Sequence, residues 1–209
     1  MTQPARDNRI SRRGWLIAGL AIPLFRAHAA QPLAVSFDGD NLHIAAPDLH
    51  FLSGKALDRL RNADTVVFFS QLTLFSDSQG TIFRHPVRER LVVSYDLWEE
   101  KFAVAIPGAT RGVSHLTALQ AEAWCIENLA ISALGMAPNR PFWLTFELRT
   151  ASQKELSSVV GESGISLSTL MIDMLSRKPG ADDLSWTLRA GPLRLSDLPR
   201  SVSRGARNG

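Results

Sequence analysis

The sequence predicts an α+β domain in which an antiparallel β-meander, or small antiparallel sheet, is packed by two to four helices. Three observations lead to this prediction. Runs of alternating apolar residues are joined by short turns, which is typical of antiparallel strands. Amphipathic helical segments lie among these runs without the regular βαβα order of a parallel sheet. Residues 30–200 are also numerous enough to bury one core, so we expect a single globular domain there.

The first 29 residues have the three-part order of an export signal. Four arginines precede an uncharged apolar run over residues 14–25, and small residues flank His28 after it. The run is shorter than the roughly 20 residues that cross a bilayer. The pair Arg12-Arg13, followed by Gly14 and Trp15, is similar to a twin-arginine signal. We expect residues 1–29 to be removed and the protein to be periplasmic or secreted; the alternative is a buried N-terminal helix.

Removing this leader changes the charge of the protein. The full chain has 23 Lys and Arg against 20 Asp and Glu, but the leader holds five arginines and one aspartate, which leaves 18 basic and 19 acidic residues. Nucleic-acid binding needs clustered cations, so we expect no nucleic-acid partner. The remaining sequence has no apolar run long enough to span a membrane.

The first half of the domain predicts mostly strands. Two short strands are expected over residues 33–46, around a turn at residues 38–41. A helix should follow the cap Ser53, with Ala56, Leu57 and Leu60 at helical spacing. Residues 65–75 are apolar on both faces and predict a central strand covered on both sides.

The meander is expected to continue through residues 82–98 and 102–106. Pro86 cannot donate to a strand ladder, so the start of the first of these strands should lie at an edge or a bulge. Ser114 is expected to open a helix over residues 114–128, with Leu116, Leu119, Ala123 and Ile126 on its buried stripe.

The last part of the domain should hold one clean strand and two more helices. Residues 142–149 alternate, with Phe142, Leu144, Phe146 and Leu148 inward. A capping box at residues 152–155 predicts a short helix, and residues 166–178 predict a longer one. Residues 184–195 supply a final strand or two, and residues 201–209 should form a disordered tail.

The familiar catalytic and cofactor motifs are missing from the sequence. It contains no P-loop, no GxGxxG after a strand, no GxSxG and no HExxH, so we expect no cofactor. Cys125 is the single cysteine and is expected to be buried. His115 and Cys125 lie ten residues apart on one predicted helix, about 15 Å along its axis, which excludes a catalytic dyad between them.

Two groups of side chains are candidate sites. His43, Asp48 and His50 are the nearest approach to a metal-ligand set, but with no further ligand in view the alternative is that the histidines are ordinary surface residues. The second group lies on one face of a predicted strand and is a candidate anion-binding patch, in which arginines would bind the anion and a tryptophan would stack on it. Its residues are Arg84, Arg88, Arg90, Asp96 and Trp98. The alternative for this group is a solvated face on which the acid partly neutralises the arginines.

The segments ALDRL, VVFFSQLTLF and LVVSYDLWEEKFAV resemble a group of exported bacterial proteins that share a domain of unknown function. The similar features are a helix ahead of paired long strands and the pair Tyr95-Asp96 near a strand end. The resemblance extends over about residues 50–150. It implies an exported soluble domain and assigns no catalytic residue.

These observations favour an exported, non-catalytic domain that binds a partner protein or another envelope component through its sheet face or edge. Two alternatives stay open. One is a small-ligand binder, for a lipid between sheet and helices or for an anion. The other is an enzyme whose site is assembled from residues far apart in the sequence.

Overall fold

The computed structural model describes residues 33–108, 111–151 and 184–201. The predicted leader, the predicted helices at 152–155 and 166–178, and the tail after Ser201 lie outside the described residues. The described part of the chain forms two antiparallel sheets and two α-helices, which confirms the predicted α+β class.

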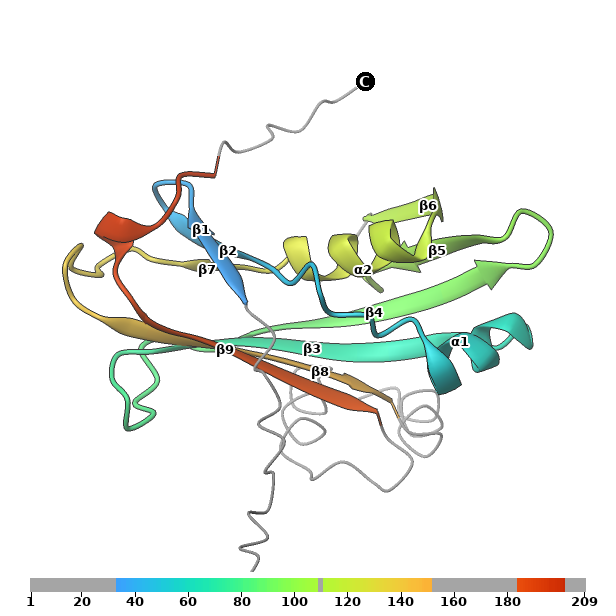
Figure 1. Cartoon of the computed structure of the whole chain (residues 1–209), viewed down its shortest axis with the longest axis horizontal. Helices are drawn as coiled ribbons and strands as arrows, with labels where there is room; N and C mark the ends of the chain where they lie inside the picture. The colour runs from blue at the N-terminus through green and yellow to red at the C-terminus, as the bar shows by residue number, and fades with distance from the viewer. Residues whose placement is uncertain (1–32, 109–110, 152–183, 202–209) are drawn as a thin grey trace, which may run out of the picture.

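The larger sheet has six strands in the order β6-β5-β4-β3-β8-β9 (Figure 1). Strands β3 to β6 are joined by consecutive antiparallel pairings and form the predicted meander, whereas β8 and β9 pair on the other side of β3. Strand β3 is therefore central, as its two apolar faces predict. The bounds are β3 (Val66–Phe75), β4 (Val87–Asp96), β5 (Lys101–Ala105), β6 (Gly112–Leu116), β8 (Phe142–Thr150) and β9 (Ser185–Leu193).

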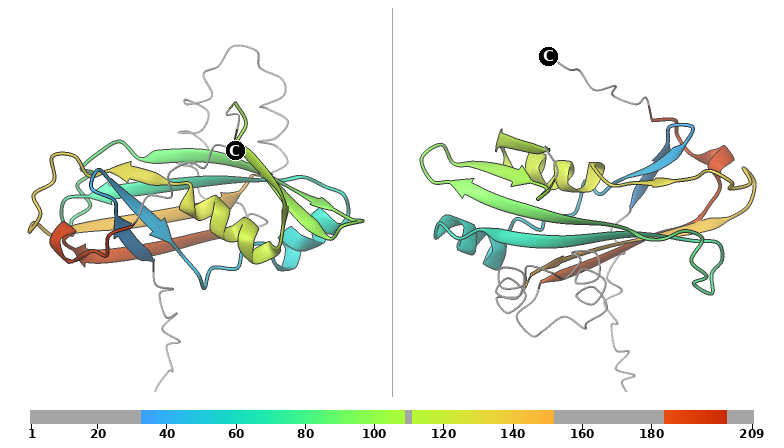
Figure 2. Two further views of the ribbon diagram at one scale, coloured as in Figure 1. Left: turned by 90° about the horizontal axis from the view of Figure 1, so that it is seen from above. Right: turned by 180° about the vertical axis from the view of Figure 1, so that it is seen from behind.

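A second layer covers one face of this sheet. It consists of helix α2 (Ala118–Glu127) and a three-stranded sheet in the order β1-β2-β7, and both lie over the large sheet in Figures 1 and 2. We call the covered face the inner face and the opposite one the outer face. Helix α1 (Gly54–Arg61) contacts β3 and β4. The strands of the small sheet are β1 (Ala34–Phe37), β2 (Asn41–Ala45) and β7 (Ala130–Ser132), and a 3₁₀ turn follows β9 at Leu195–Asp197.

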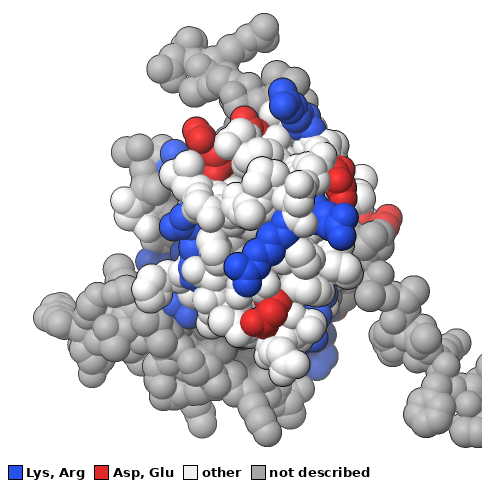
Figure 3. Space-filling model, turned by 90° about the vertical axis from the view of Figure 1, so that its left-hand side faces the viewer, with Lys and Arg blue, Asp and Glu red and all other residues white. Residues whose placement is uncertain are grey.

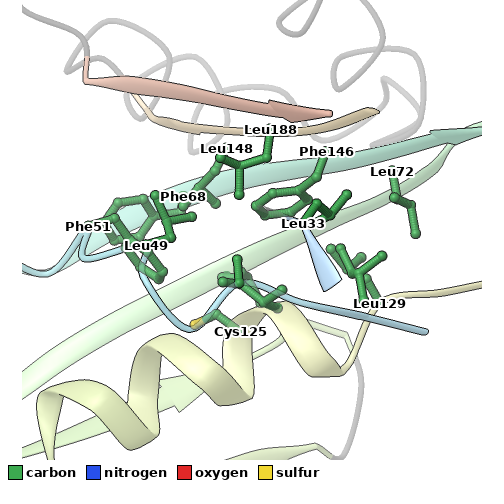
Figure 4. Packing of buried hydrophobic residues seen from close by; sticks show 14 of the residues in the cluster. Leu33, Leu49, Phe51, Phe68, Leu72, Cys125, Leu129, Phe146, Leu148 and Leu188 are labelled. Carbon is green, nitrogen blue, oxygen red and sulfur yellow. The ribbon is translucent and has the colours of Figure 1, made fainter. Parts of the chain in front are cut away.

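The core lies between the two layers (Figure 4). Phe51, which precedes α1, packs edge-on against Phe68 of β3 with ring centroids 4.9 Å apart. Large buried side chains of this kind each contribute about 1.5–3 kcal/mol to folding. The inward residues predicted for β8 are confirmed, since Phe142, Leu144, Phe146 and Leu148 are buried. The same core holds four buried residues of β3: Val66, Phe68, Leu72 and Leu74.

The predicted helix at 114–128 is wrong at its start. Residues Gly112–Leu116 form β6 and pair with β5, and α2 begins only at Ala118. Thr117 is the cap: the Gln120 backbone N–H donates to its Oγ1 at 3.3 Å, while the Gln120 side chain accepts from the Thr117 N–H at 2.9 Å. Strand pairing with β5 thus overrides a local helical pattern.

The buried stripe of α2 also differs from the prediction. Ala121, Glu122, Cys125 and Ile126 face the core, whereas Leu119 is 63% exposed. Alanine and cysteine are small, so the helix packs closely on β2 along this side. The predicted burial of Cys125 is confirmed.

The expectation for Pro86 is confirmed as well. The first half of β4, from Val87 to Leu91, pairs with β3 alone, because β5 reaches only Val92 to Asp96. This half of β4 is an edge next to the proline, where no ladder donor is lost.

Candidate functional site

Two of the five residues in the predicted anion patch lie together on the outer face. Arg88 stands opposite Gln71 of β3, and Arg90 stands opposite Phe69. The Arg88 Nε donates to the Gln71 side-chain oxygen at 2.6 Å, and the Gln71 amide in turn donates to Glu147 of β8 at 3.3 Å. This network spans three strands and already uses part of the hydrogen-bonding capacity of Arg88.

The other three residues lie apart from these two: Asp96 is the last residue of β4, six positions after Arg90, while Arg84 and Trp98 lie outside the strand. The Arg84 side chain donates to the carbonyl oxygen of Leu134 and ties the segment before β4 to the one after β7. Asp96 accepts the backbone N–H groups of Trp98 and Glu99 at 2.8 and 3.1 Å, and these bonds lower the pKa of its carboxyl. Trp98 is 97% exposed in the β4–β5 turn. The alternating side-chain pattern holds only within β4, so it does not place Arg84 and Trp98, which lie before and after the strand.

A concave site lies at the end of the outer face where β3 ends and β8 begins. We call it the Trp143 depression; it has a volume of about 480 Å³. Phe75 and Trp143 are cross-strand partners in its wall, and Thr145 pairs with Arg189 beside them. The β3–β4 connection closes one side with residues 77–80. Figure 3 views this end of the molecule, where basic side chains are spread among uncharged ones with acidic side chains between them.

Gly191 of β9 makes room for the Trp143 ring. A Cβ built on Gly191 would lie 2.7 Å from Cγ of the indole, and the residue has φ +140°, which favours glycine. The pairing of β8 with β9 shifts register between Phe142 and Leu144, beside Trp143. Bulges of this kind redirect a side chain.

Two charged side chains, Asp77 and Arg189, line the Trp143 depression, and they differ in whether they are free to contact a ligand. The Asp77 carboxylate accepts the backbone N–H groups of Gln79 and Thr81, both at 3.0 Å. These hydrogen bonds, those from Thr81 first, lower the pKa of Asp77 and commit its charge to the loop. Arg189 is exposed on the outer face and is the cation among the described lining residues.

The predicted metal cluster of His43, Asp48 and His50 is not assembled. The His43 Nε2 lies 2.7 Å from Asp38, and the His50 Nδ1 lies 3.1 Å from Glu122. His43 belongs to β2, while Asp48 and His50 lie in the connection that leads to α1. Within residues 33–108, 111–151 and 184–201, no group of three or more His, Cys, Asp or Glu side chains could hold a metal ion.

A second concave site, of about 250 Å³, lies at the β4–β5–β6 end of the sheet, and we call it the His115 depression. The His115 Nε2 is 3.0 Å from a carboxylate oxygen of Glu99, and its Nδ1 is 2.9 Å from the Ser114 Oγ. The prediction that His115 and Cys125 lie on one helix is wrong, because His115 belongs to β6. Burial raises the pKa of the Cys125 thiol to about 12, so no thiolate is available there.

Sequence reasoning missed the residues that shape both depressions. Phe75, Trp143 and Arg189 come from three strands, and alternation places each on one face without saying which strands are neighbours. Thr145 and Arg149 lie on the outer face, opposite Thr73 and Phe69, and both are only 7% exposed. The Arg149 guanidinium lies 5.1 Å from the centre of the Phe69 ring, a cation–π contact.

Neither α1 nor α2, the helices of the described part of the chain, is long and apolar enough to cross a membrane. No protein-family model matches this chain, and no curated protein or solved structure was found to be similar to it. The resemblance to exported proteins of unknown function therefore stays a prediction, and function has to be argued from the two depressions.

Proposed function

We propose that this protein is an exported domain, periplasmic or secreted, that binds an acidic component of the cell envelope in the Trp143 depression. One observation carries the proposal: a concave site of about 480 Å³ in which two aromatic rings and an exposed arginine come together on a rigid sheet. Concave sites that combine apolar surface with a few placed polar groups are typical of ligand binding.

The chemistry of the lining favours an anion attached to a ring. Trp143 and Phe75 supply flat apolar surface against which a ring can pack. Arg189 supplies a guanidinium fork that matches the geometry of a carboxylate or a phosphate. The Asp77 carboxylate is held by its own loop, which leaves the Arg189 guanidinium as the charged group of the lining that is available to a ligand.

Binding rather than catalysis is the function we assign to this depression. Its described lining residues include neither histidine nor cysteine, so no group there is suited to moving a proton near neutral pH. Export is supported by the leader-like order of residues 1–29. Protein isolated from the cell envelope should therefore begin near Ala30, which N-terminal sequencing will establish.

Calorimetry with a defined acidic ligand tests the binding proposal. The probe is an oligogalacturonate, a saccharide with one carboxylate per ring, and a neutral oligoglucoside of the same length is the comparison. We expect the acidic saccharide alone to bind. The variant Arg189→Gln should weaken binding about tenfold, which corresponds to the loss of one charge-assisted hydrogen bond.

The matched control for this experiment is Arg194→Gln. Arg194 is also exposed and follows β9, but it does not line the depression. Both variants lose one positive charge, so a general electrostatic effect would change them equally. Equal affinities of Arg189→Gln and Arg194→Gln, or no preference for the acidic saccharide, would contradict the proposal.

A partner protein is the second candidate, and exposed apolar residues favour it. Ile82 and Leu134 are 54% and 59% exposed, and Phe83 beside Ile82 is 36% exposed. The Arg84 side chain bridges the two segments through the Leu134 carbonyl. Crosslinking in the envelope fraction should capture one specific protein, and Leu134→Ser should reduce the capture while Leu119→Ser, on exposed α2 surface, should not.

A further inference from the structure

We propose that Ser114 is a nucleophile, that His115 is its general base and that Glu99 positions the histidine, so that the His115 depression reacts with small activated esters. This inference concerns a different site from the Trp143 depression and does not depend on it. A nucleophile within hydrogen-bond reach of a base that a third group orients is the general signature of covalent catalysis.

The three side chains form one continuous chain. The Ser114 Oγ lies 2.9 Å from the His115 Nδ1, and the His115 Nε2 lies 3.0 Å from a Glu99 carboxylate oxygen. The carboxylate accepts from Nε2–H, which leaves the lone pair of Nδ1 directed at the serine hydroxyl. The imidazole is therefore held in the tautomer that can accept the Ser114 proton.

A β-bulge creates this arrangement. Phe102 pairs with Leu116, and Val104 pairs with Val113, so Ser114 and His115 of β6 together stand opposite Ala103 alone. His115 takes up the extra length with φ +62°, a left-handed conformation that costs free energy for a residue with a Cβ. Bulges and strained residues are over-represented at functional sites because they redirect side chains that regular pairing would place elsewhere.

The surroundings suit an ester with a developing negative charge. Lys101 lines the same depression and supplies a positive charge near the reacting carbonyl. Asp96 also lines it, but the turn N–H groups of Trp98 and Glu99 hold its carboxylate. The His115 and Glu99 side chains are 70% and 52% exposed, so water screens their attraction and admits small substrates. We infer a modest acceleration, confined to esters with good leaving groups.

The reaction is ordinary acyl transfer to water. The Ser114 Oγ attacks the ester carbonyl while its proton passes to His115 Nδ1. The bond to the leaving alcohol then breaks, and the proton from His115 goes to that alcohol, which leaves an acyl-serine. Water, deprotonated by the same imidazole, attacks the acyl group and releases a carboxylic acid and free Ser114. One ester and one water give one acid and one alcohol.

Labelling with an alkyl fluorophosphonate tests the nucleophile directly. The Ser114 Oγ forms a bond to phosphorus, fluoride leaves, and His115 takes the proton. Mass spectrometry of the purified protein should show one adduct, located on Ser114, and p-nitrophenyl acetate should be hydrolysed at the same site. The variant Ser114→Ala should abolish both signals. Ser94→Ala is the matched control, because Ser94 lines the same depression from β4 while the hydrogen bond to His115 Nδ1 comes from Ser114; this variant should label as the original protein does.

The base and the positioning residue have readouts of their own. His115→Gln should slow labelling about 100-fold, the usual contribution of a general base. Glu99→Gln should change the pH profile of labelling, because the neutral amide no longer stabilises the imidazolium, while circular dichroism stays unchanged.

A Ser114→Cys variant keeps the test valid if the alanine variant misfolds. Its thiol should react with iodoacetamide faster than the thiol of Ser94→Cys, because His115 draws the proton from it. The proposal is overturned if no adduct forms on Ser114, if labelling is equal with and without His115, or if the two engineered thiols react at the same rate. Arg189→Gln should leave all these rates unchanged, which separates this site from the Trp143 depression.

Discussion

Glu122 is a buried carboxylate that fastens the connection between β2 and α1 to helix α2. Its side chain is only 6% exposed. One of its oxygens accepts the backbone N–H of Leu52 at 2.7 Å, and the other lies 3.1 Å from the His50 Nδ1. Replacing Glu122 by alanine removes both contacts and leaves the buried Leu52 N–H without its acceptor.

The expected loss follows from these contacts. A buried donor without a partner costs about 1–3 kcal/mol. The lost methylene adds about 0.8 kcal/mol of apolar burial. The contact with His50 adds little, because the His50 side chain is 54% exposed and water screens it. We therefore expect Glu122→Ala to lower the free energy of unfolding by about 2–4 kcal/mol, whereas Glu122→Gln, which keeps a side-chain oxygen for Leu52, should lose about 1 kcal/mol.

Urea unfolding followed by tryptophan fluorescence measures these differences. Glu127→Ala is the matched control, because Glu127 lies on the same helix and is exposed. That variant should stay within about 0.5 kcal/mol of the original protein, as most surface substitutions do. If Glu122→Ala is no less stable than Glu127→Ala, the carboxylate does not hold the β2–α1 connection and the reasoning is refuted.

Three further predictions concern single residues. Burial raises the pKa of the Cys125 thiol to about 12, so this thiol should resist alkylation at pH 8 in the folded protein and react in urea; equal alkylation rates in the two states would contradict its burial. The raised pKa also means that stability should fall as the pH rises above the ordinary thiol pKa. Gly191→Ala should displace Trp143 and lower stability by about 1–3 kcal/mol, seen as a loss of near-ultraviolet dichroism, and an unchanged spectrum would show that the ring does not occupy this space. The hydrogen bond with His43 comes first among the causes that hold the pKa of Asp38 below its usual range. The ionised Asp38 carboxylate therefore stabilises the fold above the ordinary carboxyl pKa, and this stabilisation is lost as the pH falls. Asp38→Ala should lose less stability between pH 5 and pH 3 than the original protein, and equal losses in urea unfolding would count against this prediction.

The local sequence pattern correctly predicted the strands in which side chains keep a period of two from end to end. Strand β8 alternates without interruption, and its four inward residues were identified correctly. Strand β3 is apolar on both faces and is the central strand of the larger sheet, as expected. The turn at residues 38–41 separates β1 from β2 as the sequence indicates. In each case the side-chain period of two belongs to the strand itself.

The errors arise where pairing with another segment competes with the local pattern. Ser114 and Leu116 fit a helix in the sequence, but pairing with β5 draws them into β6 and delays the helix until Ala118. Arg84 lies in the same predicted alternation as Arg88, but its side chain bonds to the segment after β7. The partner of β6 is the preceding strand β5, and the partner of Arg84 lies 50 residues away; in both cases the outcome depends on pairing between segments and not on the period of either one.

The sequence by itself determined the class of the fold, the identity of the central strand and the burial of Cys125, because these depend on apolar periodicity along short stretches. Only the tertiary structure decided which side chains meet. The Trp143 depression needs the register of β3, β8 and β9, and the His115 depression needs a one-residue bulge between β5 and β6. Register is set by contacts between segments far apart in the chain, and a shift of a single residue would turn every side chain of a strand to the other face.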